Sequence, residues 1–399
     1  MENQKKVFQT LEELFRESFG NSHEETRWFF APGRVNLIGE HIDYCGGSVL
    51  PAALQMGTFA VARRKESAEI VLESTSMENR VSFCADDPVY LESDGWGNYP
   101  KGIFAEYHQR DVPGQGLEIL YHGNIPGGGL SSSASIEVCT AFIIETLNQF
   151  RLDSDTLQNR KEIARLCQHS ENHFNGMNCG VMDQAAVALG KKGHAILMDC
   201  SDLAIEYVPF ELGDYALLIG NTCKVRKLTN SKYNERRAEV EKALALVQKH
   251  RPVNHLCELK MGELESTLGL LPDPILKRRT RHIITENNRV HEAVDALRVG
   301  QLNLFGQLLI ESHQSLKDDF EVTGQELDTL VEASLAQKGV LGARMTGGGF
   351  GGCMIALVHH QQIEAFKHNV SAHYQSKIGY FPEFYQTIAG SGANEISKS

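Results

Sequence analysis

The 399-residue sequence lacks the features of secreted, disulfide-linked and membrane proteins. No apolar run is long enough to span a bilayer, and residues 1–17 are charged and amphipathic where a signal peptide has an apolar centre. The nine cysteines are an odd number and form no C-x-x-C pair, which argues against a disulfide framework and a zinc site and is typical of reduced thiols. We therefore expect a cytoplasmic protein that does not bind membranes.

Positive charge is also scarce, because 39 basic residues face 51 acidic ones and the net charge is −12. This balance argues against wide contacts with nucleic acid or anionic membranes. We also expect a monomer. There is no low-complexity tract and no internal repeat. The length suffices for two domains, and we place them at residues 1–200 and 201–399.

The order of predicted elements is typical of an α+β protein. Residues 49–62 predict a strand, a turn and a second strand, and residues 117–122 predict a strand that leads into a Gly-Ser stretch. Residues 231–338 are mainly helical in pattern, and β-like segments flank the glycines at 347–352. We therefore expect two α+β domains with a cleft between them.

Residues 124–137 read Asn-Ile-Pro-Gly-Gly-Gly-Leu-Ser-Ser-Ser-Ala-Ser-Ile-Glu and lead into an apolar run at helical spacing. Glycines let a backbone approach a ligand closely, and a helix start presents unpaired N–H groups and a positive dipole end. Such a place binds phosphate. A glycine-rich turn with serines that cap an ordinary helix explains the same residues, and this stretch alone leaves both interpretations open.

Three familiar nucleotide-binding patterns do not apply. The sequence has no G-x-x-x-x-G-K-[ST] segment, which excludes a P-loop protein. Residues 347–352 satisfy G-x-G-x-x-G in letters, but the segment that follows them is β-like, whereas a Rossmann motif opens a helix. The signature segments of protein kinases are absent as well.

The segments 34–44, 124–137 and 346–352 together resemble the three signature motifs of the GHMP small-molecule kinases. Residues 31–44, Ala-Pro-Gly-Arg-Val-Asn-Leu-Ile-Gly-Glu-His-Ile-Asp-Tyr, look like the galactokinase signature, and residues 174–184 and 231–233 are similar to galactokinases too. This resemblance implies the two-domain GHMP fold. Its N-terminal domain has a mixed sheet and a phosphate-loop helix, its C-terminal domain has helices on an antiparallel sheet, and the active site lies in the cleft.

The resemblance implies that ATP gives its γ-phosphoryl group to the C1 hydroxyl of galactose. The catalytic aspartate and arginine of the family match Asp183 and Arg34. Asp183 would orient or deprotonate the sugar hydroxyl, and Arg34 would stabilise negative charge on the transferred group. A buried salt bridge with only a structural role is the alternative for this pair.

The resemblance also implies a sugar-binding set. Carboxylates suit a sugar because each can accept hydrogen bonds from two adjacent hydroxyls. For the histidine a role in the core, and for the tyrosine a packing role, are the alternatives. The matching positions are Glu40, His41, Asp43, Gly180, Asp183 and Tyr233.

The Gly-Ser stretch should hold the phosphates of ATP, and the aromatic residue near the adenine in the family matches Trp96, for which a place in the core is the alternative. The Mg²⁺-facing residues of the family match Ser133 and Glu171, and two are enough because Mg²⁺ keeps waters and binds phosphates. The implied nucleotide-binding residues are Gly127, Gly128, Gly129, Leu130, Ser131, Ser132, Ser133, Ala134 and Trp96.

Two positions depart from the galactokinase pattern. Ile42 and Cys45 stand where galactokinases usually have Thr and Asn, and this variant resembles N-acetylgalactosamine kinases of the same family. The phosphate loop between Pro126 and Leu130 is also one residue shorter than the usual pattern. We expect a galactokinase. An N-acetylgalactosamine 1-kinase or a dual-specificity kinase is the first alternative, and a non-catalytic galactose and ATP sensor is the second.

Overall fold

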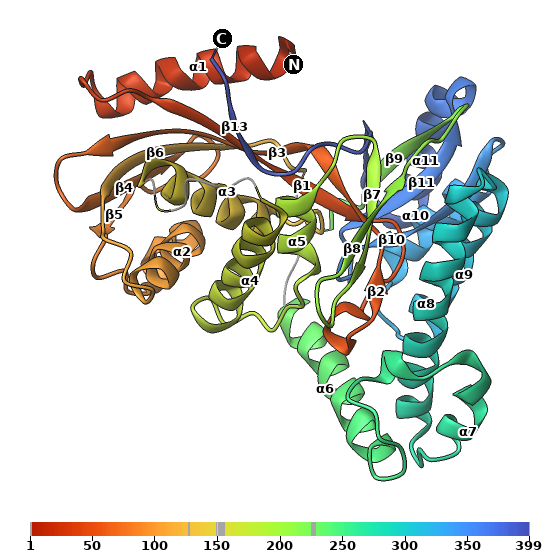
Figure 1. Cartoon of the computed structure of the whole chain (residues 1–399). Coiled ribbons are helices and arrows are strands. Elements are labelled where there is room, and N and C mark those ends of the chain that lie inside the picture. Colours follow the sequence, from red (N-terminus) through yellow and green to blue (C-terminus); the bar gives the residue numbers. More distant parts are fainter. Residues whose placement is uncertain (1, 127, 149, 151–155, 225–228, 399) are drawn as a thin grey trace.

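The computed structural model describes residues 2–126, 128–148, 150, 156–224 and 229–398 (Figure 1). Three β-sheets with helices packed around them account for its core. None of the helices in the described residues is long and apolar enough to cross a membrane.

The first part of the chain builds a six-stranded mixed sheet in the order β13-β1-β3-β6-β4-β5. β4 runs parallel to β6, and the other neighbours are antiparallel. β13 lies near the end of the chain and pairs with β1, so the C-terminal residues return to the N-terminal sheet. The strands are β1 (Arg27–Asn36), β3 (Pro51–Lys65), β4 (Glu69–Ser74), β5 (Val81–Cys84), β6 (Gly116–Gly123) and β13 (Asn394–Ile396).

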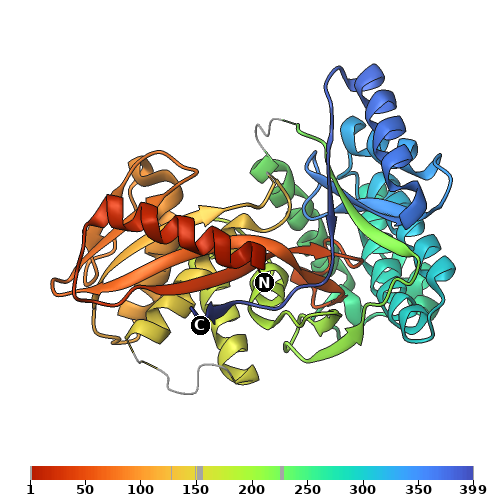
Figure 2. The ribbon, with the colours of Figure 1, turned by 90° about the horizontal axis from the view of Figure 1, so that it is seen from above.

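Helices cover both faces of this sheet (Figures 1 and 2). α1 (Glu2–Phe19) lies alone on the outer face, where Phe8 stacks on Trp28 with ring centres 5.0 Å apart and Phe15 is fully buried. Burial of this aromatic cluster stabilises the outer layer. The inner face is covered by α2 (Asn98–His108), α3 (Ser132–Leu147), α4 (Leu157–His173) and α5 (Met182–Leu189).

The second sheet is antiparallel, in the order β10-β11-β9-β12, and α9, α10 and α11 of the C-terminal half pack on it. Its strands are β9 (Tyr215–Asn221), β10 (Val340–Thr346), β11 (Cys353–His359) and β12 (Glu383–Thr387). The helices are α6 (Thr229–Val247), α7 (Leu264–Leu268), α8 (Pro274–Arg298), α9 (Leu302–Asp318), α10 (Gln325–Leu335) and α11 (Ile363–Ile378).

A small third sheet, in the order β2-β7-β8, lies between the other two (Figure 1). It consists of β2 (Ser48–Val49), β7 (His194–Asp199) and β8 (Ile205–Pro209). The remaining elements are the 3₁₀ helices η1 (Asp43–Cys45), η2 (Glu92–Gly97), η3 (Leu256–Glu258), η4 (Met261–Glu263) and η5 (His360–Gln362). The predicted α+β architecture, with its mixed and antiparallel sheets, is confirmed.

One local prediction is wrong. Residues 49–62 predicted a turn between two strands, but β3 continues through Gly57 without a break. Gly57 lies directly against β1, where a Cβ atom would overlap the backbone carbonyl of Ala31. The glycine is needed for this close crossing of two strands and not for a turn.

Candidate active site

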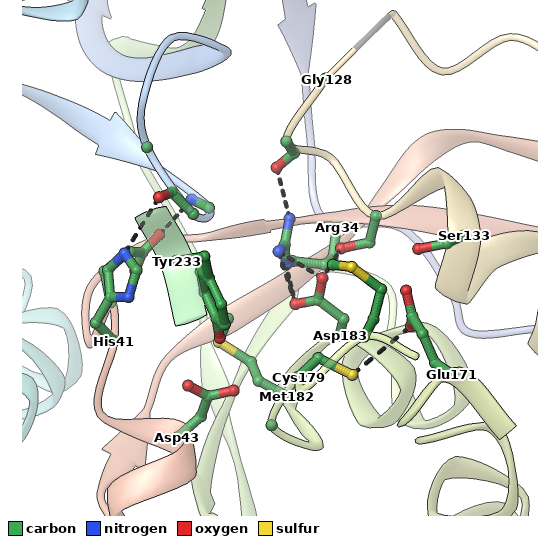
Figure 3. A pocket seen from close by; sticks show the side chains of 18 of the residues that line it. Arg34, His41, Asp43, Gly128, Ser133, Glu171, Cys179, Met182, Asp183 and Tyr233 are labelled. Carbon is green, nitrogen blue, oxygen red and sulfur yellow. Dashed lines mark hydrogen bonds and ion pairs between the residues drawn. The ribbon is translucent and has the colours of Figure 1, made fainter. Parts of the chain in front are cut away.

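A cavity of about 230 Å³ lies where the first and second sheets meet, and the segments singled out in the sequence line it. The loop after β1, the start of α3, the end of α4, the start of α5, the first turns of α6 and the glycines between β10 and β11 all reach it (Figure 3). The predicted site residues that line it are Arg34, Glu40, His41, Asp43, Gly128, Gly129, Ser131, Ser132, Ser133, Glu171, Gly180, Asp183 and Tyr233.

Arg34 and Asp183 form a two-pronged ion pair at the centre of this cavity (Figure 3). Arg34 donates from Nε to Oδ1 over 2.8 Å and from Nη2 to Oδ2 over 2.7 Å, while its Nη1 donates to the carbonyl of Gly129 over 2.7 Å. The arginine is only 4% exposed. Since a fork-to-carboxylate pair fixes both orientation and distance, the carboxylate is held rigidly in the cavity.

The first residue before α3 tests the helix-cap interpretation of the Gly-Ser stretch. Ser131 has a left-handed backbone, with φ 61°, and its side chain makes no capping hydrogen bond to the helix. Its hydroxyl instead donates to Oδ2 of Asp183 over 2.5 Å. A strained non-glycine residue at a helix start that leaves the cap unmade is expected at a functional site and not in an ordinary turn.

Asp43 lies on the other side of this pair, beside Tyr233 (Figure 3). Gly180 packs so closely against it that an added Cβ atom would overlap the Asp43 carboxylate. Burial raises the pKa of Asp43 to about 7, and the negative charge of Asp183 contributes further to the raised value. Near neutral pH the carboxyl group therefore exists in both protonation states.

His41 is buried among aromatic rings at the same end of the cavity. Its ring centre lies 4.9 Å from that of Phe320 and 5.4 Å from that of Tyr233. Burial lowers the pKa of His41 to about 3, so the imidazole is neutral. One nitrogen is 3.3 Å from the carbonyl of Gly348 and must carry the proton, which leaves the other to accept from Tyr44 Oη at 3.1 Å. His41 thus combines a packed ring with a place on the cavity wall.

Glu40 lines the cavity, but its carboxylate is already engaged. Oε1 accepts from the backbone N–H of Gly347 over 2.7 Å, and Oε2 accepts from Arg344 Nη1 over 3.2 Å and from the amide of Asn36. Burial raises the pKa of Glu40, which is 1% exposed. The residue ties the glycines after β10 to the loop after β1. Its contact with a sugar stays a prediction.

Ser133 and Glu171 face each other on the opposite side of the central ion pair (Figure 3). The Ser133 hydroxyl lies beside the Glu171 carboxylate, and Gln184 Nε2 donates to Glu171 Oε2 over 2.5 Å. Burial raises the pKa of Glu171 to about 7. A hydroxyl and a carboxylate are oxygen ligands of the kind that Mg²⁺ takes, so the pair fits this ion. The described residues hold no group of three or more acidic, His or Cys ligands, so the remaining ligands would be phosphate and water oxygens.

Three predicted nucleotide-binding residues lie elsewhere. Leu130 and Ala134 are buried in the core, and Leu130 contributes its carbonyl to the N–H of Arg34 over 3.1 Å. Trp96 does not line the cavity, and its indole N–H points to the carbonyls of Glu78 and Asn79. A role for these side chains in binding ATP stays a prediction. Gly127 lies outside the described residues.

Arg344 was not predicted from the sequence, although it binds the segment after β1 that lines the cavity. This arginine is fully buried on β10, donates to the carbonyls of Asn36 and Leu37, and lies between Glu40 and Glu286. The only available signal was a charged residue in an apolar strand just before the glycines at 347–349. Such a residue needs a buried partner, but the sequence does not say which carboxylate supplies it.

Comparison with known proteins agrees with this geometry. Residues 13–64 match the model of the galactokinase galactose-binding signature, residues 98–191 match the GHMP kinase N-terminal domain, and residues 293–376 match the GHMP kinase C-terminal domain. The chain is 48% identical to the galactokinase of Clostridium tetani over 93% of both chains. It is 47% identical to that of Enterococcus faecalis over 97% of this chain and 100% of the relative.

Solved structures show the same relationship. The crystal structure of Lactococcus lactis galactokinase complexed with galactose superposes with a TM-score of 0.93 at 43% identity, covering 98% of this chain and 100% of the other. The mevalonate kinase of Methanococcus jannaschii has a TM-score of 0.63 at 19% identity over 94% of this chain and 100% of its own, which shows the shared fold. The chain therefore belongs to the galactokinase family of GHMP kinases.

Proposed function

We propose that this protein transfers the γ-phosphoryl group of ATP to the C1 hydroxyl of galactose. The observation that carries the proposal is the position of the Arg34–Asp183 pair. On one side of it the start of α3 and the Ser133–Glu171 pair form a place for phosphates, and on the other side Asp43, Gly180 and Tyr233 form a place for a polar ligand (Figure 3).

Asp183 and Arg34 have different roles in the transfer. The Asp183 carboxylate accepts a hydrogen bond from the attacking hydroxyl and aims it at the phosphorus. Arg34 lies beside the same point and stabilises negative charge on the transferred group as it leaves ADP. Phosphoryl transfer depends mainly on positioning and charge neutralisation, so a rigid pair held by Gly129 and Ser131 supplies what the reaction needs.

The start of α3 would hold the ATP phosphates. Its unpaired N–H groups and positive dipole end attract anions, and the serine hydroxyls at 131–133 add donors. Ser133 and Glu171 would hold Mg²⁺. The ion, when bound, neutralises charge on the phosphates and orients them for in-line attack.

Selection of the sugar rests on Asp43. A buried carboxylate that accepts from two hydroxyls rejects an epimer, because a misplaced hydroxyl leaves the carboxylate without a partner. The two departures in the signature do not enlarge this place. Ile42 is fully buried in the core, the Cys45 thiol donates to the carbonyl of His41 over 3.8 Å, and neither side chain lines the cavity. N-acetylgalactosamine is accordingly not favoured as the substrate.

A substrate comparison tests the proposal. ATP-dependent release of ADP is measured with galactose, N-acetylgalactosamine and glucose at equal concentrations, and kcat/KM is compared. We expect galactose to exceed glucose by about 10³-fold, the scale of a buried hydrogen-bond mismatch. Equal kcat/KM for galactose and glucose would contradict the role of Asp43, and a lead for N-acetylgalactosamine would contradict the proposed substrate.

A further inference from the structure

A second cavity, of about 270 Å³, lies behind the sugar end of the active site. The two cavities share a wall made of Asp43, Cys179 and Gly180. The far side of the second cavity is formed by α4 and α6, which belong to different halves of the chain, and by the segment before η3. A volume this far above the roughly 10–15 Å³ that one water needs has room for a small organic ligand.

Two arginines and a histidine line this cavity from three separate elements. Arg165 comes from α4, Arg237 from α6, and His255 from the segment before η3. Arg165 donates to the carbonyl of Asp202 over 3.0 Å and forms no ion pair with a carboxylate in the described residues. The residue is exposed, so its guanidinium is hydrated and open to an anion in the cavity.

Arg237 is held across the gap between the two halves. Its Nη1 donates to the carbonyl of Asn178 over 2.7 Å, and its guanidinium lies 5.7 Å from the centre of the Tyr44 ring. Its one carboxylate partner within the described part of the chain, Glu241, is 64% exposed, so solvent screens that pair.

The lining itself carries little negative charge, although Asp199 and Glu258 lie behind it, bonded to Ser201 and to the backbone N–H of His255. Asp43 is the one acidic side chain among the described residues that line the cavity, and it also faces the active site. The thiols of Cys179 and Cys200 have pKa values raised well above the usual range by burial, so they remain neutral. In a protein with a net charge of −12, a cavity with this balance is unusual.

We propose that this second cavity binds a small phosphate monoester, held by Arg165 of α4 and Arg237 of α6 with His255 as a further donor. Arginine suits this ligand because its planar fork matches phosphate oxygens. A ligand bound here bridges α4 and α6 directly behind the wall that carries Asp43 and Gly180. Its charge lies close to Asp43, so it should weaken galactose binding, and galactose should weaken its binding by the same factor.

The experiment separates this site from the ATP phosphate site. The active site is filled with galactose, Mg²⁺ and a non-hydrolysable ATP analogue, and inorganic phosphate or galactose 1-phosphate is titrated at constant ionic strength, with binding followed by ³¹P NMR. The wild type is compared with Arg165→Gln and Arg237→Gln. Arg298→Gln is the matched control, because Arg298 is a partly exposed arginine that lines neither cavity.

We expect one site that remains available when the active site is full, with a dissociation constant raised at least tenfold by either cavity variant and unchanged by the control. Tighter binding of galactose 1-phosphate than of inorganic phosphate would identify a sugar phosphate as the ligand, and equal binding would identify the phosphate group alone. Loss of binding when the active site is filled, equal affinity in all four proteins, or no binding of either probe would each overturn the proposal.

Discussion

Asp43 offers a prediction in which function and stability oppose each other. The carboxyl group is partly buried beside Asp183, and its pKa is raised from 3.8 to about 7. Each tenfold change in an acid dissociation constant corresponds to about 1.4 kcal/mol, so keeping this group ionised in the folded protein costs about 4 kcal/mol at most. Solvent screening of a partly exposed group reduces this, and we expect about 2–4 kcal/mol.

The sign follows from the raised pKa. Well below pH 3.8 the group is neutral in both the folded and the unfolded chain, so it costs nothing. Between about pH 4 and 7 the carboxyl group loses its proton in the unfolded chain but keeps it in the folded protein, so the folded state loses stability as the pH rises. Above pH 7 the group is ionised in both states and the loss of stability stays constant. Asp43→Asn removes the charge and keeps the size of the side chain. The variant should therefore be more stable than wild type at pH 8 and lose that advantage toward pH 4.

Urea unfolding of the ligand-free protein at pH 4.5, 6 and 8 measures this difference. Calorimetry at pH 8 should show galactose affinity reduced by about 100-fold, because an amide cannot accept from two hydroxyls as a carboxylate does. Asp295→Asn, at a carboxylate that is 74% exposed, is the control and should change neither quantity. A variant that is less stable than wild type at pH 8, with the same pH dependence as wild type, would refute the reasoning.

Three further predictions concern the walls of the site. Gly180→Ala places a methyl group against the Asp43 carboxylate and should raise the KM for galactose at least tenfold without changing the KM for ATP. Equal effects on the two KM values in steady-state kinetics would contradict this prediction. Glu171→Gln should raise the Mg²⁺ concentration for half-maximal ADP release about tenfold, and an unchanged Mg²⁺ titration would exclude it as a ligand. Arg344→Met leaves Glu40 buried without its cation and should lower the free energy of unfolding by about 3–5 kcal/mol in urea, where a loss below about 1 kcal/mol would count against a buried charge network.

Much of the fold follows from local pattern. Residues 231–338 were predicted to be mainly helical, and the structure has α6 to α10 there. The apolar residues around the glycines at 347–352 predicted the strand pair β10 and β11. These elements have one buried face, so their periodicity carries the information. The strand β3 was predicted less well because its glycine is explained by a neighbour 26 positions earlier, Ala31, which a local pattern does not contain.

The site was predicted through the order of the motifs and not through their geometry. Family resemblance grouped Arg34, Asp183 and the serines as one set, and the structure places them around one cavity. The hydrogen bonds of Glu40 to the N–H of Gly347 and to Arg344 could not be predicted, nor could the burial of Arg344. They depend on which groups meet between the two sheets. The second cavity is invisible in the sequence for the same reason, since its arginines lie 72 positions apart.

The most direct test of the account is the rate of phosphoryl transfer to galactose by Asp183→Asn, with galactose binding measured separately by calorimetry. Asparagine keeps the size of the side chain and one acceptor for Arg34, and it removes the carboxylate that faces the hydroxyl. We predict that kcat falls by about 10²–10⁴-fold, the usual share of a positioned general base, while galactose still binds within about tenfold of the wild-type affinity. A kcat within a factor of about three of wild type would contradict the central claim that this ion pair carries the chemistry.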